Sequence, residues 1–354
     1  MSDSFNSKSE KKNIPSNITK FSKIDTEKIL QEHLHKKYGQ RFLDYRKKYF
    51  ESINYESYGK EGDYPNQIIL ELVNRCNLEC VMCYQGWRND SKKYTLSDLD
   101  LSNLFADFKK NKLNSLMISI SEPLLYKNIK KVFDLAKDAQ IMDIFLFTNG
   151  TLLNQKNAEM ILESSVTRLF VSIDAFSPET YNKVRVPVSK NNSNERIKKL
   201  EENIINFMKL RKIKKKNLPL VRTSFVALED NSDEIKKFSD KWVDIVDSVE
   251  VQKEISINAY SNSANFETKQ LFNFAEQTGK RYECRQPWTS LGIYSDGSVT
   301  PCCNTFGRNL PIGNIKENTI SEIWKSNLIK NVRDGFKKNT PCNGCKICLD
   351  NTAE

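Results

Sequence analysis

Short apolar runs alternate with amphipathic segments over most of the chain. Runs rich in β-branched and apolar residues predict six strands, at 67–73, 115–120, 142–147, 168–173, 219–228 and 247–251. Between them apolar residues recur at helical spacing, as at Leu101, Leu104 and Phe108, and predict helices such as 97–110 and 127–139. Alternating strands and helices are typical of an α/β fold with a parallel sheet, either a barrel or an open doubly wound sheet.

The two ends of the chain differ from this central pattern. Residues 1–65 are polar, with a helical tendency over 26–52, and predict a tail followed by a helix on the outside of the main domain. From about residue 280 the chain becomes rich in turns and cysteines. We therefore expect three parts: a polar tail and helix over 1–65, an α/β domain over 66–279, and a small cysteine-rich module over 280–354.

Composition and charge narrow the class of protein. The 354 residues are 38% hydrophobic and 28% charged, which is typical of a globular protein and excludes a fibrous one. No apolar run approaches about eighteen residues and the N-terminus lacks a signal-peptide core, so we expect a cytoplasmic protein without a membrane partner. The net charge is +10, but the densest basic run, 211–216, contains no aromatic residue. It predicts a solvated helix end, and no nucleic-acid partner is expected.

Nine cysteines are the most informative feature of the composition. An odd number without a secretion signal indicates metal or redox chemistry and not a disulfide framework. Three of them, Cys76, Cys80 and Cys83, directly follow the first predicted strand. The other six lie in the C-terminal quarter, at Cys284, Cys302, Cys303, Cys342, Cys345 and Cys348. This distribution predicts two metal sites on two modules.

The first three cysteines have the spacing C-x3-C-x2-C, which leaves one ligand position open. A four-iron cluster needs four ligands, so three thiolates leave one iron free, whereas a structural zinc site is closed by four ligands. A zinc knuckle that takes its fourth ligand from elsewhere stays an alternative. The stretch CNLECVMC after a first strand resembles the signature of radical S-adenosylmethionine enzymes.

This resemblance implies a fold, a cofactor set and a reaction type. The fold would be a partial (β/α)6 barrel, and the three cysteines would hold a [4Fe-4S] cluster whose open iron is chelated by S-adenosylmethionine. An electron from the cluster then cleaves the sulfonium to a 5′-deoxyadenosyl radical, which abstracts a hydrogen atom from the substrate. A reductant such as flavodoxin or ferredoxin would supply the electron.

Further positions resemble the binding residues of this family. Glu122, in Ile120-Ser121-Glu122-Pro123, matches the acid of a Gly-Gly-Glu-Pro motif that binds the methionine amino group. Here Ile120 and Ser121 replace both glycines, which puts the close backbone approach of that motif in question.

The resemblance also covers residues that follow the predicted strands, where ligands bind in parallel α/β folds. The positions that resemble contacts to the nucleoside and the methionyl carboxylate are Thr148, Asn149, Ser172 and Asp174, with Arg185 as a salt-bridging residue and Tyr84 as an aromatic against the adenine. Each has a structural alternative: Asn149-Gly150 is a turn signal, Asp174 and Ser177 are helix caps, Arg185 is a solvated side chain and Tyr84 is a core residue.

The C-terminal module resembles the SPASM domain, an auxiliary iron–sulfur module, in the phrases IYSDGSVTPCC, IGNIKENTISEIW and CNGC. It departs from the full pattern because it has too few cysteines for two auxiliary clusters, and so resembles the single-cluster form called twitch. The resemblance implies one auxiliary [4Fe-4S] cluster held by Cys284, Cys302, Cys342 and Cys345, with the choice between Cys345 and Cys348 left open by spacing alone. A zinc ribbon is the alternative for this module.

Two cysteines, Cys303 and Cys348, have no role as cluster ligands in this assignment. They are either small buried hydrophobic residues or hydrogen-atom donors to a substrate radical, which would make the reaction an epimerisation.

The expected function is the oxidation of a small polar substrate, such as a sugar or cyclitol, with the auxiliary cluster accepting the second electron. The alternatives are a peptide- or protein-modifying maturase, the radical epimerase, and a cluster protein that only senses or carries electrons. Residues that could face the substrate are Arg222, Ser224, Asn231 and Gln252.

Overall fold

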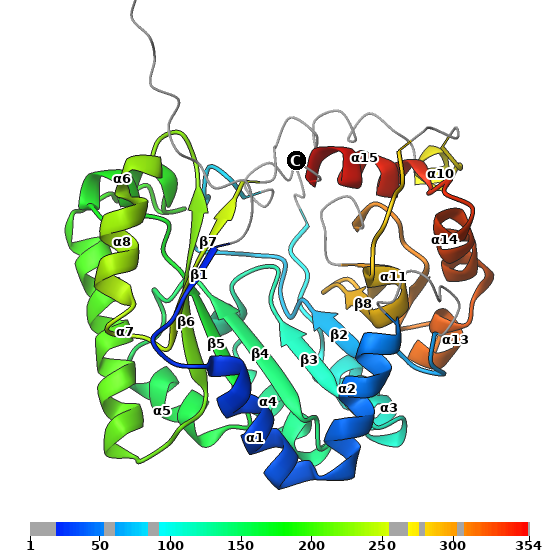
Figure 1. The fold of residues 1–354 in the computed structure, drawn as a ribbon, viewed down its shortest axis with the longest axis horizontal. Helices are drawn as coiled ribbons and strands as arrows, with labels where there is room; N and C mark the ends of the chain where they lie inside the picture. The colour runs from blue at the N-terminus through cyan, green and yellow to red at the C-terminus, as the bar shows by residue number, and fades with distance from the viewer. Residues whose placement is uncertain are drawn as a thin grey trace, which may run out of the picture.

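A parallel sheet forms the centre of the protein (Figure 1). The structure is a computed structural model that describes residues 19–52, 61–83, 92–254, 268–275, 280–302 and 308–352. Its strands are β1 (Thr19–Phe21), β2 (Gln67–Leu70), β3 (Ser115–Ile118), β4 (Asp143–Thr148), β5 (Arg168–Ser172), β6 (Leu220–Ala227), β7 (Ser248–Lys253), β8 (Ser290–Ile293), β9 (Ser298–Thr300) and β10 (Gly313–Asn314). They follow the order β1-β7-β6-β5-β4-β3-β2-β8-β9-β10.

Strands β2 to β7 confirm the six predicted strands, and each pairs in parallel with the next one along the chain. The sheet is curved but not closed among the described residues, because β1 and β10 form its two edges. It is therefore a partial (β/α)6 barrel, and the α/β fold class is confirmed.

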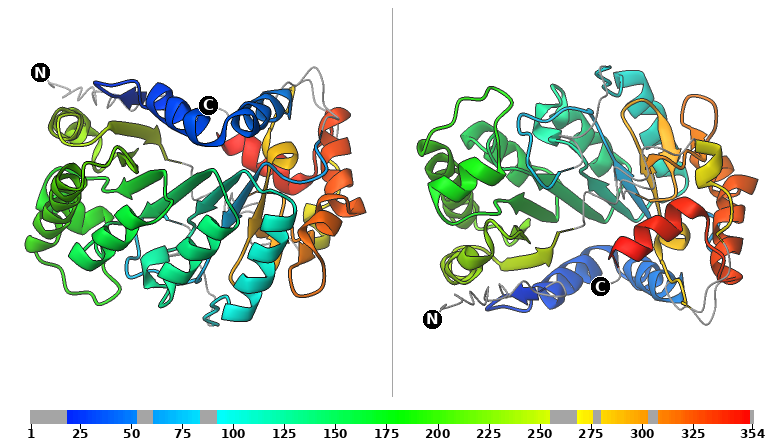
Figure 2. Two further views of the ribbon diagram at one scale, coloured as in Figure 1. Left: turned by 90° about the horizontal axis from the view of Figure 1, so that it is seen from below. Right: turned by 90° about the horizontal axis from the view of Figure 1, so that it is seen from above.

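Helices cover both faces of the sheet (Figure 2). They are α1 (Thr26–Tyr38), α2 (Gln40–Ser52), α3 (Asp98–Lys110), α4 (Ile129–Asp138), α5 (Gln155–Glu163), α6 (Pro178–Val184), α7 (Glu195–Ile213), α8 (Ile235–Trp242), α10 (Thr268–Leu271), α11 (Gln286–Thr289), α13 (Ile320–Trp324), α14 (Asn327–Lys337) and α15 (Asn343–Thr352), with 3-10 turns η3 (Pro123–Leu125) and η4 (Ser232–Glu234). Helices α3 to α8 lie on the outer face, whereas α1 and α2 cross the opposite face, which we call the inner face (Figure 2).

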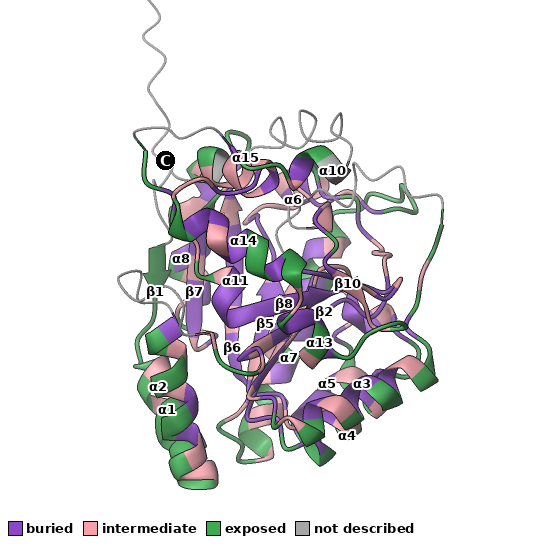
Figure 3. Ribbon diagram, turned by 90° about the vertical axis from the view of Figure 1, so that its right-hand side faces the viewer, coloured by how far each residue is buried: buried purple, intermediate pink, exposed green. Residues whose placement is uncertain are grey.

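Local sequence explains why the outer helices form where they do. In α3 the Ser97 hydroxyl accepts the Asp100 N–H and the Asp100 carboxylate accepts the Ser97 N–H, which is a capping box. The predicted apolar stripe, including Leu101, Leu104 and Phe108, is buried against the sheet. Figure 3 shows the same division across the molecule, with buried strands and helices that expose one side.

The predicted N-terminal helix is instead two helices, because Gly39 interrupts it with a φ of +55°. This left-handed conformation favours glycine and ends α1. Leu30, Leu34 and Phe42 of the two helices pack with Leu220 of β6. Helices α1 and α2 therefore cover the part of the inner face near the start of β6.

The C-terminal module continues the main sheet without a break. Its first strand, β8, pairs in parallel with β2, and β9 and β10 follow in antiparallel order. The boundary predicted near residue 280 thus falls shortly before β8. Helices α14 and α15 complete the module, and α15 lies at the end toward which the parallel strands point (Figure 1).

Two features were not predicted from the sequence pattern. One is β1, whose three residues are all exposed and pair with β7. The other is the addition of β8 to the barrel sheet. In the described part of the chain, no helix has the length and apolar character needed to span a membrane.

Candidate active site

The first three cysteines lie in the loop that leaves β2, at the carboxyl edge of the sheet. Backbone hydrogen bonds fasten this loop to the segment after α6: the Glu79 N–H donates to the Val186 carbonyl over 2.7 Å, and the Val81 N–H donates to the Val184 carbonyl over 3.1 Å. The cysteine loop is therefore held against the C-terminal end of α6.

Hydrogen-bond donors surround two of these thiols. The Cys76 sulfur accepts bonds from the Leu78 N–H (3.4 Å) and the Asn149 side-chain amide (3.5 Å), and the Cys80 sulfur accepts one from the Arg185 guanidinium (3.4 Å). Burial raises the pKa of the Cys76 thiol to about 12 and also raises that of Cys80. Burial thus favours the protonated thiols. The hydrogen-bond donors would stabilise the thiolates that form when a metal cation displaces the thiol protons.

This donor set fits an iron–sulfur cluster. Three thiols on one loop provide three ligands and leave one position for a further ligand. Within the described residues, no three Cys, His, Asp or Glu side chains gather tightly enough to hold a single metal ion.

Glu122 is the buried carboxylate of the site, with 1% of its surface exposed. One oxygen accepts the Thr148 hydroxyl (2.8 Å) and the Leu124 N–H (3.1 Å), and the other accepts the Asn149 N–H (2.8 Å). Burial raises the pKa of Glu122 to about 7. A cationic amino group placed beside it would favour the charged form.

Ile120 keeps the backbone conformation of a glycine. Its φ is +83°, which lies in the left-handed region where a β-branched side chain is strained. The sequence departs from the Gly-Gly-Glu-Pro pattern at this position, but the chain still makes the turn that directs Glu122 inward. The strained residue therefore lies two positions before the candidate binding residue.

Asp174 and Arg185 form a buried ion pair at the same edge. Asp174 is fully buried with a φ of +62°, and its other oxygen accepts the Val226 N–H over 2.8 Å. The cap of α6 is Ser177 and not Asp174, so the helix-cap alternative for Asp174 is wrong. Arg185 is buried as well, so the alternative of a solvated side chain is also wrong.

The structure thus brings most of the predicted binding residues together. Cys76, Cys80, Glu122, Asn149 and Arg185 meet at one edge of the sheet through the bonds described above. Asn77, which the sequence analysis missed, joins them by accepting the Asn149 amide (2.8 Å) and donating to Thr151 (2.9 Å). Its only signal in the sequence is its place between two cysteines.

The remaining predicted residues have different positions. Ser172 is half-buried at the end of β5 and pairs in register with Ser224 of β6. Asn231 is fully buried and bonds to the backbone of Asp174 and Val226, so it holds a loop and does not face the inner face. Tyr84 and Cys303 lie outside the described residues.

The inner face carries a polar layer above the part covered by α1. The Arg222 guanidinium lies 3.6 Å from the centre of the Phe170 ring and donates to the Glu250 carboxylate over 2.5 Å. Deeper on this face, Arg168 bonds to Glu27 of α1 and to Asp143. The even-numbered residues of β6 therefore point inward, which fixes the direction that alternation alone left open for Arg222 and Ser224.

The C-terminal cysteines converge as well. Cys284, Cys302, Cys345 and Cys348 line one small cavity together with apolar side chains such as Leu310 and Phe336. Cys342 is buried, and it interacts electrostatically with Cys345, as Cys302 and Cys284 also do. Cys345 therefore belongs both to the thiols that line the cavity and to this electrostatic group, while Cys348 lines the cavity.

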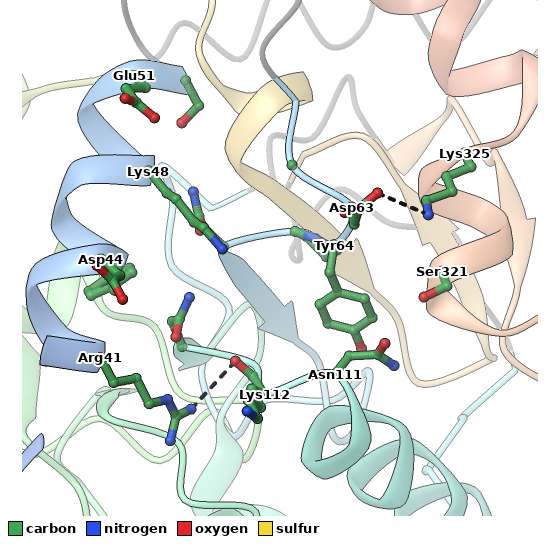
Figure 4. A pocket seen from close by; sticks show the side chains of 16 residues that line it. Arg41, Asp44, Lys48, Glu51, Asp63, Tyr64, Asn111, Lys112, Ser321 and Lys325 are labelled. Atoms are coloured by element: carbon green, nitrogen blue, oxygen red, sulfur yellow. Dashed lines mark hydrogen bonds and ion pairs between the residues drawn. The ribbon is translucent and has the colours of Figure 1, made fainter.

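A cavity of about 680 Å³ lies at the opposite end of the strands (Figure 4). Two of its basic side chains have partners: Lys325 pairs with Asp63 over 3.2 Å, and Arg41 donates to the carbonyls of Lys112 and Leu113. Residues at the amino ends of barrel strands generally serve stability, whereas ligands bind at the carboxyl ends. We therefore place the active site at the cysteine edge.

Comparisons with known families agree with this placement. Residues 70–241 match the model of the Radical SAM superfamily, and residues 284–348 match SPASM, an iron–sulfur cluster-binding domain. The two matches together span about two thirds of the chain. The protein belongs to the radical S-adenosylmethionine superfamily and carries a C-terminal SPASM domain. Its cofactors are accordingly a [4Fe-4S] cluster, S-adenosylmethionine, and auxiliary iron–sulfur clusters in the SPASM domain.

Curated relatives share only part of this chain. A probable GTP 3′,8-cyclase of Methanococcus maripaludis is 32% identical over 117 residues, which are 33% of this chain and 39% of the relative. A GTP 3′,8-cyclase of Limosilactobacillus fermentum is 29% identical over 133 residues, 37% of this chain and 39% of the relative. The chain thus spans about two fifths of the length of these relatives.

Solved structures share the fold over most of the chain. Streptococcus suis SuiB bound to its precursor peptide SuiA has a TM-score of 0.57 and 16% identity, covering 87% of this chain and 75% of SuiB. The enzyme anSMEcpe with bound AdoMet has a TM-score of 0.55 and 17% identity, covering 81% of this chain and 92% of the other. At this identity the likeness concerns the fold alone.

Proposed function

We propose that this chain is a radical S-adenosylmethionine oxidoreductase that takes a hydrogen atom from a small polar substrate, such as a sugar or cyclitol, and oxidises it. The observation that carries the proposal is the meeting of the cysteine loop, Glu122 and Arg185 at one edge, directly above a polar inner face. When bound, the cluster and S-adenosylmethionine supply a 5′-deoxyadenosyl radical, and an auxiliary cluster supplies a one-electron acceptor.

The chain's own residues would bind and orient S-adenosylmethionine. Cys76, Cys80 and Cys83 would hold the cluster, with the side chain of Asn149 and the guanidinium of Arg185 donating to two of the thiolates. Glu122 would bind the methionine amino group, because it is a buried carboxylate whose present partners are neutral donors.

Four further residues would complete this binding site. Thr148 would orient Glu122 through its hydroxyl, and Asp174 would orient Arg185 toward the methionyl carboxylate. Ser172 and Tyr84 retain the roles that the family resemblance implies, near the nucleoside and against the adenine.

For the auxiliary cluster we propose Cys284, Cys302, Cys342 and Cys345 as ligands. Cys342 supports this choice because it lies directly before α15, where a hydrogen bond from the Cys345 thiol, and then the backbone amides of Cys345 and Gly344, lower its pKa. Cys348, which lines the cavity together with Cys284, Cys302 and Cys345, would then be a thiol that holds no cluster. A role of Cys303 or Cys348 as hydrogen-atom donor belongs to the alternative of an epimerase.

The inner face favours a polar substrate of low net charge. Arg222 offers a cation that Glu250 already balances, and Ser172, Ser224 and Gln252 add hydroxyl and amide groups nearby. Such paired groups recognise hydroxyls by hydrogen bonds. The names of the curated relatives support a second candidate, ring closure on a purine nucleotide, but a triphosphate would need more unbalanced positive charge than Arg222 provides.

The test uses the full chain, reconstituted anaerobically with iron and sulfide, with S-adenosylmethionine, dithionite and a panel of polyols, cyclitols and GTP. We expect a polyol or cyclitol to raise 5′-deoxyadenosine above the substrate-free level and to yield a product two hydrogen atoms lighter. Formation of 5′-deoxyadenosine with GTP alone would support the nucleotide candidate instead. Its absence with every compound, while the clusters are intact, would contradict the enzyme assignment.

A matched pair of variants tests the substrate face. Arg222→Met removes the arginine of the polar layer, whose side chain is 18% exposed, whereas Arg168→Met removes an arginine of similar exposure that pairs with Glu27 of α1. We expect Arg222→Met to raise the KM for substrate about tenfold while substrate-free cleavage of S-adenosylmethionine persists. Arg168→Met should lower thermal stability and leave KM unchanged, and equal KM values in both variants would remove Arg222 from the substrate site.

A further inference from the structure

Glu71 is a fully buried carboxylate at the point where β2 ends, and the cysteine loop begins five residues after it. Its backbone N–H donates to the Ile293 carbonyl of β8 over 2.8 Å, which extends the parallel pairing of these strands. The outer-face positions of β2 are Ile68 and Leu70, in the main apolar core, so Glu71 continues the inner-face series. A buried charge of this kind is retained only where partners compensate it.

The two carboxylate oxygens join parts of the chain that are far apart in sequence. One oxygen accepts the Ser121 hydroxyl over 3.1 Å and lies 3.5 Å from the Arg308 guanidinium. The other accepts both the N–H (3.1 Å) and the hydroxyl (2.8 Å) of Ser295. Ser121 belongs to the loop after β3, whereas Ser295 and Arg308 belong to the C-terminal module.

Two of these partners, Ser121 and Ser295, belong to segments that lead to the two candidate sites. Ser121 directly precedes Glu122. Ser295 begins the β8–β9 turn, and the strand that follows leads to Cys302. The hairpin is tightly packed, because a Cβ on Gly292 of β8 would lie 2.8 Å from the Cys302 carbonyl oxygen. A displacement at Ser295 would therefore be transmitted to Cys302.

We propose that Glu71 is a positioning residue that couples the S-adenosylmethionine site to the auxiliary-cluster module, by holding the Ser121–Glu122 loop and the Cys302 hairpin against each other. The inference rests on the proposed function in taking Glu122 as the amino-group ligand. It also gives a physical reason for Ser121 at a position where the family motif has glycine, since a glycine could not donate the hydroxyl bond to Glu71.

The first test measures affinity at one site after a change at the other. On the reconstituted holoprotein, Glu71→Gln and Ser295→Ala are compared with the wild type for the dissociation constant of S-adenosylmethionine, by anaerobic equilibrium dialysis. In Glu71→Gln, either Ser295 or the side of Ser121 and Arg308 faces an amide N–H₂ in place of a carboxylate oxygen, so we expect affinity to fall about tenfold. Ser295→Ala, in the other module, should weaken binding about threefold. Affinities within about twofold of the wild type in both variants would overturn the proposal.

The second test does not depend on S-adenosylmethionine. Amide hydrogen exchange of the holoprotein should accelerate in residues 119–124 and 290–302 together in Glu71→Gln, with iron content unchanged. Asp143→Asn is the matched control, because Asp143 is a buried carboxylate at the opposite end of the sheet, bonded to Thr167 and Arg168. It should accelerate exchange near its own partners only.

The two tests separate the failure of this inference from that of the proposed function. If the wild type does not bind S-adenosylmethionine, the proposed function fails while the exchange pattern still tests Glu71. Faster exchange confined to one of the two segments would overturn the coupling. Should Glu71→Gln not fold, Ser121→Ala and Ser295→Ala each remove one hydroxyl and leave the carboxylate in place, and each should accelerate exchange in both segments.

Discussion

The two cysteine groups of this protein are built in opposite ways. Cys76, Cys80 and Cys83 lie within one loop, so their spacing in sequence already determines their proximity. The C-terminal thiols come from three separate segments, and only the packing of β8, β9 and α15 brings them to one cavity. The first site can therefore be predicted from the sequence, whereas the second depends on the tertiary fold.

This difference predicts that the two sites have different functions. The cysteine loop is surrounded by Glu122, Asn149 and Arg185, which are groups suited to a charged ligand. The C-terminal cavity is lined by thiols and apolar side chains such as Leu310 and Phe336. The first site is equipped to bind S-adenosylmethionine and the second to hold a closed cluster.

The largest effect should come from the first site. Replacing Cys76, Cys80 and Cys83 with alanine should reduce 5′-deoxyadenosine formation to the level of protein-free controls, because no ligands remain for the cluster that S-adenosylmethionine would bind. Anaerobic assays with dithionite measure this by chromatography. Residual formation well above those controls would show that cleavage occurs elsewhere.

The corresponding change at the second site should separate cleavage from product. Cys284→Ala should leave 5′-deoxyadenosine formation near the wild-type rate while the oxidised product falls at least about tenfold, because the second electron lacks its acceptor. The ratio of product to 5′-deoxyadenosine is the quantity to measure. An unchanged ratio would remove the auxiliary site from the reaction.

The choice of the fourth auxiliary ligand is tested by a matched pair of variants. Cys342→Ala should lower iron content by about four atoms per chain, whereas Cys348→Ala should leave it near the wild-type value. Iron analysis, together with electron paramagnetic resonance of the reduced protein, distinguishes the two variants. The reverse result would identify Cys348 as the ligand and Cys342 as the spare thiol.

A smaller effect is expected at the carboxylate of the first site. Glu122→Gln should weaken S-adenosylmethionine binding about 10- to 100-fold, because a charge-assisted hydrogen bond to the amino group is lost. The exposed Glu79 in the cysteine loop provides the control, and Glu79→Gln should bind normally. Equal affinities in both variants would place the amino group elsewhere.

The smallest effect is predicted at the strained residue beside Glu122. Ile120→Gly relieves a positive φ but loses the packing of a half-buried side chain, so the free energy of unfolding should change by no more than about 1 kcal/mol. Ile118→Ala, in the buried core of β3, should cost about 2 to 5 kcal/mol. Thermal unfolding compares the two variants. A similar loss of unfolding free energy in both would mean that Ile120 is not strained.

The sequence predicted those parts of the fold that local patterns determine. The β6 run from Leu220 to Ala227 and the stripe of α3 are long and periodic, and both appear where they were expected. Strand β1 could not be found in this way, because its three exposed residues carry no apolar pattern. The break at Gly39 depends on one positive φ, which the helical pattern on either side conceals.

The site was predictable to a similar degree. The cysteine loop and Glu122 follow from spacing and motif, but the bonds of Glu71 to Ser121 and Ser295 depend on strands that only the folded sheet brings together. Asn231 was a candidate for facing the substrate and instead holds a loop, because its amide bonds to nearby carbonyls. Alternation shows which residues of a strand share a face, but it does not identify the inner face and does not apply beyond the end of the strand.

The central claim is that one chain carries two clusters on two separate ligand sets. The direct test is the iron and acid-labile sulfide content per chain after anaerobic reconstitution, for the wild type, the Cys76/Cys80/Cys83→Ala variant and a Cys284/Cys302→Ala variant. The account predicts about eight irons in the wild type and about four in each variant. About four irons in the wild type, or zinc without iron, would contradict it.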